Sequence, residues 1–285
     1  MHSWADEQRM AGHRIAIVPT MGALHAGHMH LIEIAKKHAD KVVVSIFVNP
    51  IQFNRPDDFA KYPRNLDDDA WKCGEAGVDG LYLPTSDVMY PDGYETYVLP
   101  GALAEPLCGA GRPGHFRGVT TVVTKLFNAA KPHVGVFGQK DFQQLAIIRR
   151  MAIDLDTGIE IVGVPTVREE DGLAMSSRNA RLSRAERFAA RCVPDAMNVA
   201  VGAVADGETS AAVIAGMAAQ EIGHQRLAQV EYIDVRDPGS LQPVHRLQGP
   251  TLLAIAIWIG DVRLIDNVIL TPYRTPPSFW HRSRS

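Results

Sequence analysis

The sequence predicts an α/β protein in which a doubly wound parallel sheet is followed by a smaller α+β domain. Short apolar runs alternate with amphipathic stretches in the first part of the chain, which is the pattern of βαβ units. After about Val167 the helical and strand-like stretches are instead grouped apart. The chain of 285 residues also exceeds the usual size of one domain. We therefore expect two domains, at residues 1–168 and 169–285.

The first βαβ unit is predicted between Ile15 and Val48. Ile15–Val18 has the pattern of a buried strand, and Val42–Val48 is a second one that is rich in β-branched residues. Between them, residues 27–38 carry apolar side chains at i, i+3 and i+4, which indicates a helix. The two strands should be parallel, because a helix connects them.

The alternation of helices and strands continues to Val164. Asn65 is positioned to cap a helix whose acidic first turn suits the helix dipole. The elements predicted after it are a strand at Gly80–Leu83, a helix at Val119–Ala130, a strand at Val134–Phe137, a helix at Asp141–Ile153 and a strand at Ile159–Val164.

The second domain is predicted to begin with helices and to end with strands. Ser183 opens a helix with a capping box, and Pro194 should kink or end that helix. The tail at Thr275–Ser285 is rich in Pro, Ser and Arg, so we expect it to be loose. The remaining elements expected are an Ala-rich helix at Thr209–Ile222 and strands at Val230–Val235, Leu252–Ile259 and Ile265–Leu270.

Composition disfavours several classes of partner. The net charge is −3, with 29 basic and 32 acidic residues, whereas nucleic-acid binders usually carry a basic domain. The 3 cysteines form no CxxC pair, which suits a reducing compartment. We see neither an apolar run long enough to span a membrane nor the apolar centre of a secretory signal. We expect a cytoplasmic protein with no nucleic-acid or membrane partner.

Polar and glycine-bearing segments follow the predicted strands. In an open parallel sheet, ligands bind at the carboxyl ends of the strands, so these segments should converge on one cleft. They are Pro19–His28 after the first strand, Asn49–Phe53 after the second, Gly138–Asp141 after the fourth, and Met175–Arg178 beyond Val164.

The histidines His25 and His28 are the most informative pair in these segments. Their i, i+3 spacing at a helix start lets both rings point the same way, beside free backbone N–H groups that suit a polyanion. Imidazolium donors there could stabilise charge growing on a triphosphate. A zinc pair is an alternative, although zincins place histidines at i, i+4 around a Glu that is absent here. Incidental surface histidines are another.

The other polar groups are weaker signals when taken singly. Lys140 beside Asp141 suits a phosphate contact, although such a pair is often only a solvated surface. Ser176–Arg178 offers hydroxyls and a guanidinium to phosphate oxygens, although such a tripeptide is also common in loops and caps. Gln52 and Gln144 are neutral hydrogen-bonding groups that suit a hydroxy-acid substrate. Their joint placement at strand ends favours a site.

Two nucleotide-binding motifs are excluded. Gly109–Gly114 matches GxGxxG, but no strand precedes it and Pro113 interrupts it, whereas the dinucleotide fingerprint needs a strand before it and a helix after it. The sequence also contains no GxxxxGK[ST], so it does not encode a Walker-type ATPase.

Residues 25–28 form an HxGH motif, and residues 175–178 form a serine-rich basic loop. Together they resemble the nucleotidyltransferase superfamily that includes the class I aminoacyl-tRNA synthetases. Within it, the sequence most closely resembles the pantothenate synthetase family, from about Ile15 to Leu270. Met175–Arg178 resembles the KMSKS-type loop that closes on ATP. The matching blocks are PTMGALHAGH (19–28), SIFVNPIQF (45–53), RPGHFRGV (112–119), FGQKDFQQL (137–145), GVPTVRE (163–169) and DGLAMSSRN (171–179).

The resemblance implies a Rossmann-like domain that binds ATP and pantoate, a smaller C-terminal lid and a homodimer. Gln52 and Gln144 would hold pantoate, and Gln52 would also lie near β-alanine. His28 would be nearest to an acid catalyst, assisted by His25 and Lys140. The residues implied for ATP are Met21, Gly22, Ala23, Leu24, His25, Ala26, Gly27, His28, Gly138, Gln139, Lys140, Asp141, Val167, Met175, Ser176, Ser177 and Arg178.

The implied reaction is the ATP-dependent condensation of (R)-pantoate with β-alanine through a pantoyl-adenylate, which yields pantothenate, AMP and pyrophosphate. Mg²⁺ should accompany ATP, held mainly by phosphate oxygens rather than by a protein metal site. One departure from the family is Gln139, which replaces the usual Glu of GEKD and puts a role for that carboxylate in doubt. Another nucleotidyltransferase activity and a non-catalytic nucleotide-binding module are the alternatives.

Overall fold

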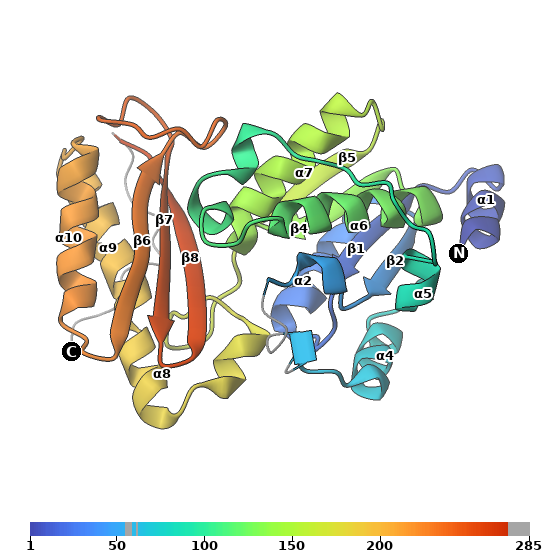
Figure 1. The fold of residues 1–285 in the computed structure, drawn as a ribbon, viewed down its shortest axis with the longest axis horizontal. Helices are drawn as coiled ribbons and strands as arrows, with labels where there is room; N and C mark the ends of the chain where they lie inside the picture. Colours follow the sequence, from blue (N-terminus) through green and yellow to red (C-terminus); the bar gives the residue numbers. More distant parts are fainter. Residues whose placement is uncertain (55–58, 61, 273–285) are drawn as a thin grey trace. The chain divides into compact units, whose positions relative to one another are not determined.

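The computed structural model describes residues 1–54, 59–60 and 62–272, and the chain divides into two compact units, Met1–Val167 and Arg168–Ser285 (Figure 1). The first unit contains a five-stranded parallel sheet with the strand order β3-β2-β1-β4-β5. The strand order reverses between β1 and β4. The strands are β1 (Ile15–Thr20), β2 (Lys41–Ile46), β3 (Gly80–Tyr82), β4 (Val134–Gly138) and β5 (Glu160–Val164).

Helices cover both faces of this sheet. Ile32 of α2 and Cys73 of α4 join the apolar cluster on one face. On the other face, Phe127 of α6 packs against Phe137 of β4, with 6.3 Å between ring centroids, and Trp4 of α1 lies beside Gly80 of β3. The helices of the unit are α1 (His2–Met10), α2 (Ala26–His38), α4 (Leu66–Glu75), α5 (Ser86–Met89), α6 (His115–Ala130) and α7 (Phe142–Asp154).

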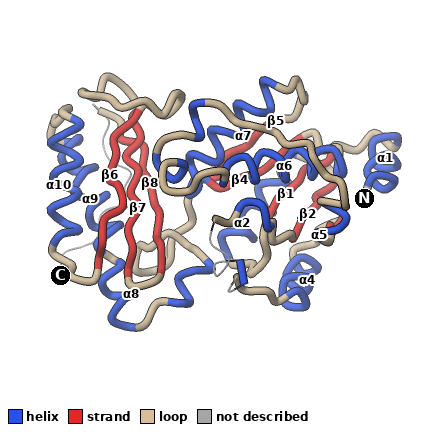
Figure 2. Tube along the Cα trace, viewed as in Figure 1, coloured by secondary structure: helices blue, strands red, loops and turns tan. Residues whose placement is uncertain are grey.

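The second unit has its own antiparallel sheet, with the strand order β6-β7-β8 (Figure 2). Its helices pack on that sheet through a separate core, in which Ile214, Ile222, Ile255 and Ile257 are fully buried. The elements are α8 (Arg184–Ala190), α9 (Cys192–Ala205), α10 (Ala211–Gly223), β6 (Ala228–Arg236), β7 (Thr251–Ile259) and β8 (Val262–Leu270). The predicted fold class, a doubly wound parallel sheet followed by an α+β arrangement, is confirmed.

Two helices begin where the sequence pattern did not predict them. α1 was not predicted, because only Ala5 of its residues is buried and its apolar pattern is weak. α6 begins at His115 rather than Val119, after Gly114 in a left-handed conformation with φ of 79°. His115 and Phe116 are buried, so tertiary packing supports a first turn that the periodicity did not reveal.

Two smaller expectations were incomplete, and a third falls on residues that the structure does not describe. Ser183 and Glu186 form the predicted capping box of α8, but α8 ends at Ala190 and Pro194 lies in the first turn of a new helix, α9, where its missing N–H costs nothing. Asn65 is the N-cap of α4, but its side chain makes no capping hydrogen bond. The tail at Thr275–Ser285 lies outside the described residues. Among the described helices, none is long and apolar enough to cross a membrane.

Candidate active site

Three of the predicted site segments follow neighbouring strands of the parallel sheet. β1 lies between β2 and β4, and the chain leaves it through residues 21–25 into α2. The chain leaves β2 into a 3-10 turn at Pro50–Gln52, and it leaves β4 into another at Gln139–Asp141. All three segments therefore lie at the same edge of the sheet, beside the switch point between β1 and β4 where open α/β sheets bind ligands.

A buried carboxylate holds the first of these segments. Asp69 of α4 is 1% exposed, and it accepts hydrogen bonds from the backbone N–H groups of Ala23, at 2.8 Å, and Leu24, at 2.6 Å. Lys72, one turn further along α4, donates to the carbonyl of Leu24 at 2.8 Å. A Cβ on Gly22 would lie 2.9 Å from the Asp69 carboxylate. The segment is thus fixed from α4, at a spacing that leaves no room for a side chain at Gly22.

The clamped segment leads into the two histidines at the start of α2. His25 is the N-cap residue, and its backbone N–H donates to Nδ1 of His28 at 3.3 Å. The two ring centroids are 4.1 Å apart. Because Nδ1 of His28 accepts a hydrogen bond, the proton of the neutral ring lies on Nε2. The two rings are adjacent, as the i, i+3 spacing predicted.

His28 is neutral in this arrangement. Its pKa is lowered from 6.5 to about 3, mainly because burial removes solvent from the charged form and then because His25 is close; Lys140 and Lys72 lower it further, while Asp141 raises it. This corrects the expectation of an imidazolium donor at His28. The ring instead offers a neutral N–H at Nε2.

Lys140 and Asp141 lie close enough to His28 to act on its charge. Nζ of Lys140 is 4.0 Å from the Asp141 carboxylate, and the two side chains are 17% and 49% exposed. They follow Gly138 at the end of β4, and Gln139 shares their 3-10 turn. The segments after β1 and β4 therefore form one electrostatic group with a lysine, two histidines and a carboxylate.

The glutamines differ in how their amides are used. Gln52 is 8% exposed; its Oε1 accepts from Asn49 at 3.0 Å and its Nε2 donates to the sulfur of Met21 at 2.9 Å. Gln52 therefore contacts the segment that contains the histidines. Gln144 lies half-buried on α7. Its neighbour Gln143 is buried and makes three hydrogen bonds to the backbone of residues 103–108, so it is a structural residue.

The fourth predicted segment belongs to the second unit, while Val167 is the last residue of the first. Met175, Ser176 and Ser177 are half-buried, and Ser176 caps the following 3-10 turn by accepting from the N–H of Arg178 at 3.3 Å. This segment is held at both ends. Before it, Arg168 and Ala174 form an antiparallel bridge.

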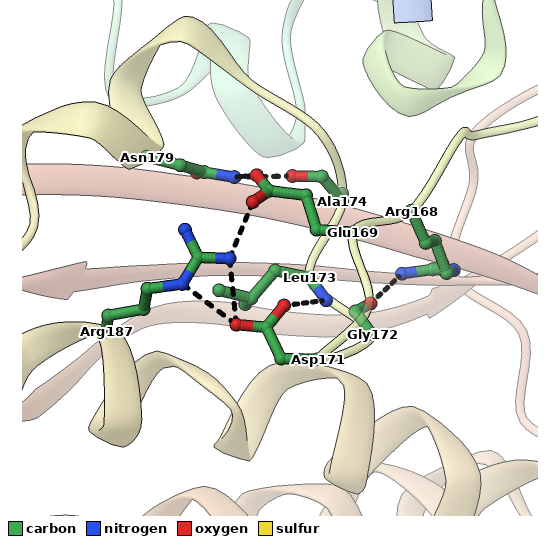
Figure 3. A network of polar contacts seen from close by, with 8 residues as sticks. All are labelled: Arg168, Glu169, Asp171, Gly172, Leu173, Ala174, Asn179 and Arg187. Atoms are coloured by element: carbon green, nitrogen blue, oxygen red, sulfur yellow. Dashed lines mark hydrogen bonds and ion pairs between the residues drawn. The ribbon is translucent and has the colours of Figure 1, made fainter. Parts of the chain in front are cut away.

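A polar network fixes the ends of this loop (Figure 3). The Nδ2 group of Asn179, a buried residue, donates to Glu169 and to the carbonyl of Ala174 at 3.0 Å. Arg187 of α8 contacts Glu169 at 2.5 Å and Asp171 at 2.9 Å. Because Asn179 and Ala174 flank residues 175–178, the network holds the two ends of the segment together.

Sequence reasoning missed two residues that shape the site. Asp69 was interpreted only as part of an acidic first turn, and Asn49 only as one residue of the predicted Asn49–Phe53 segment, with no role of its own. The sequence gives no signal for either role, because most of their partners are groups far along the chain. In the described part of the chain, no group of three or more His, Cys, Asp or Glu residues could hold a metal ion.

The fold and the arrangement of these groups define the class of the protein. A parallel sheet with a switch point carries an HxGH motif at the first βα turn, with a lysine after the adjacent strand. This combination is that of an α/β protein of the HxGH nucleotidyltransferase type.

Comparison with known proteins gives the family. Residues 1–269 match the family model described as pantoate-beta-alanine ligase. The chain is 51% identical over 270 residues to a pantothenate synthetase of Geotalea uraniireducens, and the aligned region covers 95% of this chain and 96% of the relative. A crystal structure of pantothenate synthetase from Thermus thermophilus is 40% identical, with a TM-score of 0.89 and coverage of 94% of this chain and 98% of that chain.

A crystal structure of pantoate-beta-alanine ligase from Francisella tularensis, complexed with beta-gamma ATP and beta-alanine, is also similar. It is 34% identical, with a TM-score of 0.77 and coverage of 94% of each chain. The chain belongs to the pantoate–β-alanine ligase family. It is an enzyme, and the reaction of its family is the ATP-dependent condensation of pantoate with β-alanine.

The pKa of His28 predicts an acid-sensitive fold. The unfolded chain takes up a proton on His28 near pH 6.5, whereas the folded chain takes it up only near pH 3. The free energy of unfolding should therefore be fully present above pH 6.5 and fall as the pH decreases toward 3. Because the ring keeps partial contact with solvent, we expect this residue to contribute roughly 1–3 kcal/mol to that loss.

Urea unfolding of wild type and His28→Gln between pH 7 and pH 4 measures this effect. The variant should lose less stability on acidification, while Met29→Leu, at the adjacent position, should keep the wild-type slope. Equal slopes for wild type and His28→Gln would show that the ring is not held neutral by its surroundings.

The Asp69 clamp predicts a loss of stability on a nearly isosteric change. Asp69→Asn replaces one acceptor oxygen by an NH₂ group that faces a backbone N–H, so one buried donor loses its partner. We expect a loss of about 1–3 kcal/mol in the free energy of unfolding, measured by urea denaturation. Asp67, in the same helical turn, is exposed. The control variant Asp67→Asn should therefore change the free energy of unfolding by less than about 0.5 kcal/mol. Similar losses for both variants would exclude the clamp.

Proposed function

We propose that residues 1–168 bind ATP and pantoate at the carboxyl ends of β1, β2 and β4, and that residues 169–285 act as a lid. The observation that carries this proposal is the convergence of three segments on neighbouring strands: His25 and His28 after β1, Gln52 after β2, and Lys140 after β4. Donors for phosphate oxygens and for a hydroxy acid are thereby brought to one edge of the sheet.

The first half-reaction is the formation of pantoyl-adenylate. A pantoate carboxylate oxygen attacks the α-phosphorus of ATP, the bond from that phosphorus to the bridging oxygen breaks, and pyrophosphate leaves. Charge grows on the leaving phosphates during this step. The N-terminus of α2 supports the proposal, because the positive end of its dipole favours an anion.

His28 and Lys140 would stabilise the growing charge in different ways. His28 offers a neutral donor at Nε2, because its Nδ1 accepts from the backbone of His25. The negative phosphates would raise the pKa of His28 from its low value, so the ring is suited to protonate the leaving group. Lys140 supplies a positive point charge beside it, with Asp141 limiting the net charge. His25 extends the set of donors at the same helix end.

The remaining nucleotide contacts would come from backbone and small side chains. A Cβ at Gly138 would meet no atom within 4 Å, so the backbone there is open to a ligand, and Ser176–Arg178 would close on the phosphates from the lid. The network that holds the ends of that segment supports its role, because a loop with fixed ends can present hydroxyls and a guanidinium in one geometry. The proposed nucleotide-binding residues are Met21–His28, Gly138–Asp141, Val167 and Met175–Arg178.

The second half-reaction is the attack of the β-alanine amine on the activated acyl carbon. A C–N bond forms, the bond from that carbon to the phosphate oxygen breaks, the amine loses a proton, and AMP leaves. Gln52 and Gln144 would hold pantoate through both steps, and Gln52 would also border β-alanine. The Francisella tularensis ligase, whose crystal structure contains beta-alanine and a form of ATP, supports these two ligands.

Mg²⁺ would arrive with ATP. The donor set fits a metal held mainly by phosphate oxygens, because Asp69 is occupied by backbone N–H groups and Asp141 is the half-exposed carboxylate of the β4 segment. When bound, the ion would neutralise phosphate charge. We also propose a homodimer, which the family resemblance supports, and a cytoplasmic location, which the small, odd number of cysteines with no CxxC pair supports.

The two half-reactions should be separable. With ATP and pantoate but no β-alanine, the enzyme should release pyrophosphate in a burst of about one equivalent per site, because the adenylate stays bound. Addition of β-alanine should then start steady turnover with formation of AMP. A coupled pyrophosphate assay in a stopped-flow instrument measures both phases. Continuous ATP hydrolysis without β-alanine would contradict a sequestered adenylate.

The role of Gln144 is tested by a KM comparison. Gln144→Ala should raise the KM for pantoate about ten- to a hundredfold, because a buried substrate hydroxyl loses a partner, while the KM for ATP should change little. Gln143→Ala is the control: it should lower the melting temperature, since its amide bonds hold residues 103–108. A change in the KM for ATP alone would reassign Gln144 to the nucleotide.

A further inference from the structure

A chain of directed hydrogen bonds ends at Gln52. The hydroxyl of Tyr90 donates to Oδ1 of Asn49 at 2.7 Å. Nδ2 of Asn49 donates to the carbonyl of Gly118 at 3.1 Å and to Oε1 of Gln52 at 3.0 Å. Nε2 of Gln52 then donates to the sulfur of Met21. Asn49 and Gln52 are 1% and 8% exposed, so water does not readily replace these partners.

One backbone carbonyl fixes the direction of the whole chain. The carbonyl of Gly118 can only accept, so the NH₂ group of Asn49 must face it and Oδ1 must face Tyr90. The second N–H of Asn49 then requires an acceptor, which is Oε1 of Gln52. Reversing either amide would set two donors or two acceptors against each other. Gln52 therefore has its oxygen bound within the protein and its NH₂ group directed toward Met21.

The position of this chain is rigid. A Cβ on Gly118 would lie 2.5 Å from the carbonyl oxygen of Ile51 and 2.8 Å from the backbone nitrogen of Gln52, so α6 packs directly against the turn that carries Gln52. The carbonyl of Gln52 also accepts from Nδ1 of His115 at 2.7 Å. Because the backbone of Gln52 is held in this way, only its side-chain amide is left to be oriented, and the hydrogen-bond chain does this.

Tyr90 donates the first hydrogen bond of the chain, and its surroundings keep it protonated. Its ring packs on Phe47, at 6.3 Å between centroids, and on Tyr94, at 5.1 Å. Burial, and then proximity to Tyr94 and Tyr97, raises the pKa of the Tyr90 hydroxyl, so the group keeps its proton at neutral pH. Without a donor at this position, Oδ1 of Asn49 would lose a partner, and the orientation of both amides would be less strongly determined.

We propose that Tyr90 is a positioning residue which acts through Asn49 to hold Gln52 with its NH₂ group toward the substrate, so that Gln52 recognises an oxygen acceptor of pantoate. The inference rests on the proposed role of Gln52. A thioether is a weak acceptor, so a hydroxyl or carboxylate oxygen of the substrate would be a better partner for Nε2 than Met21 is. Tyr90, which itself makes no substrate contact, would then reinforce the preference for an acceptor that the Gly118 carbonyl sets.

Adenylation kinetics with Tyr90→Phe test the inference. This variant should raise the KM for pantoate about three- to tenfold, the effect of one lost hydrogen bond, with the KM for ATP, kcat and the melting temperature close to wild type. Tyr94→Phe is the matched control, because it removes a hydroxyl from the adjacent ring of the same stack, and it should leave the kinetics unchanged. An unchanged KM for pantoate in Tyr90→Phe overturns the inference.

Two further variants distinguish positioning from other effects. In a Gln52→Ala background, Tyr90→Phe should add nothing to the KM for pantoate, because its effect passes through Gln52; an additive increase overturns the inference. Gln52→Glu keeps the shape and the acceptor toward Asn49 but removes the donor, so it should raise the KM at least as much as Gln52→Ala. A wild-type KM in Gln52→Ala would instead refute the proposed role of Gln52 itself, and a raised KM there with no effect of Tyr90→Phe refutes only the role of Tyr90.

Discussion

The turn from β1 into α2 depends on the buried carboxylate of Asp69. A charged group at 1% exposure is tolerated only when its oxygens have partners, and Asp69 obtains them from two consecutive backbone N–H groups. The same hydrogen bonds hold Gly22 and Ala23 in left-handed conformations, with φ of 84° and 52°, although such a conformation costs Ala about 1 kcal/mol. Because α2 begins directly after this turn, the positions of both histidines follow from one interaction with α4.

Burial then determines the charge of the site. Low solvent access keeps His28 neutral, and the nearby lysines reinforce this effect, since a second positive charge would be unfavourable there. If phosphates bind beside His28 as proposed, their negative charge would favour the charged ring, so proton uptake by His28 and phosphate binding would be thermodynamically linked. The groups that disfavour a cation at His28 in the free protein would thus leave the ring able to take up a proton once an anion is bound.

The sequence alone was sufficient for most of the fold and for part of the candidate site. Strands such as Ile15–Thr20 and Val134–Gly138 are mainly apolar and alternate with clear helical patterns, so their type and order were predictable. The adjacency of the segments that contain His28 and Lys140 followed from the parallel topology. Asp69 was not predictable, because its function depends on backbone N–H groups 45 and 46 positions away. The neutrality of His28 was not predictable either, since burial is a property of the folded chain.

The hydrogen bonds around the candidate site share a direction. The oxygens of Asp69, Asn49 and Gln52 are satisfied by donors within the protein, whereas the NH₂ group of Gln52 has only the weak acceptor of the Met21 thioether. Both substrates of an adenylation present mainly oxygen acceptors, as phosphates, carboxylate and hydroxyls. In the proposed site, internal donors to the oxygens of Asp69, Asn49 and Gln52 would reduce the repulsion that these oxygens exert on a substrate. Since a buried carbonyl cannot change its polarity, the backbone carbonyl of Gly118 sets the orientation that the side chains between it and the substrate must adopt.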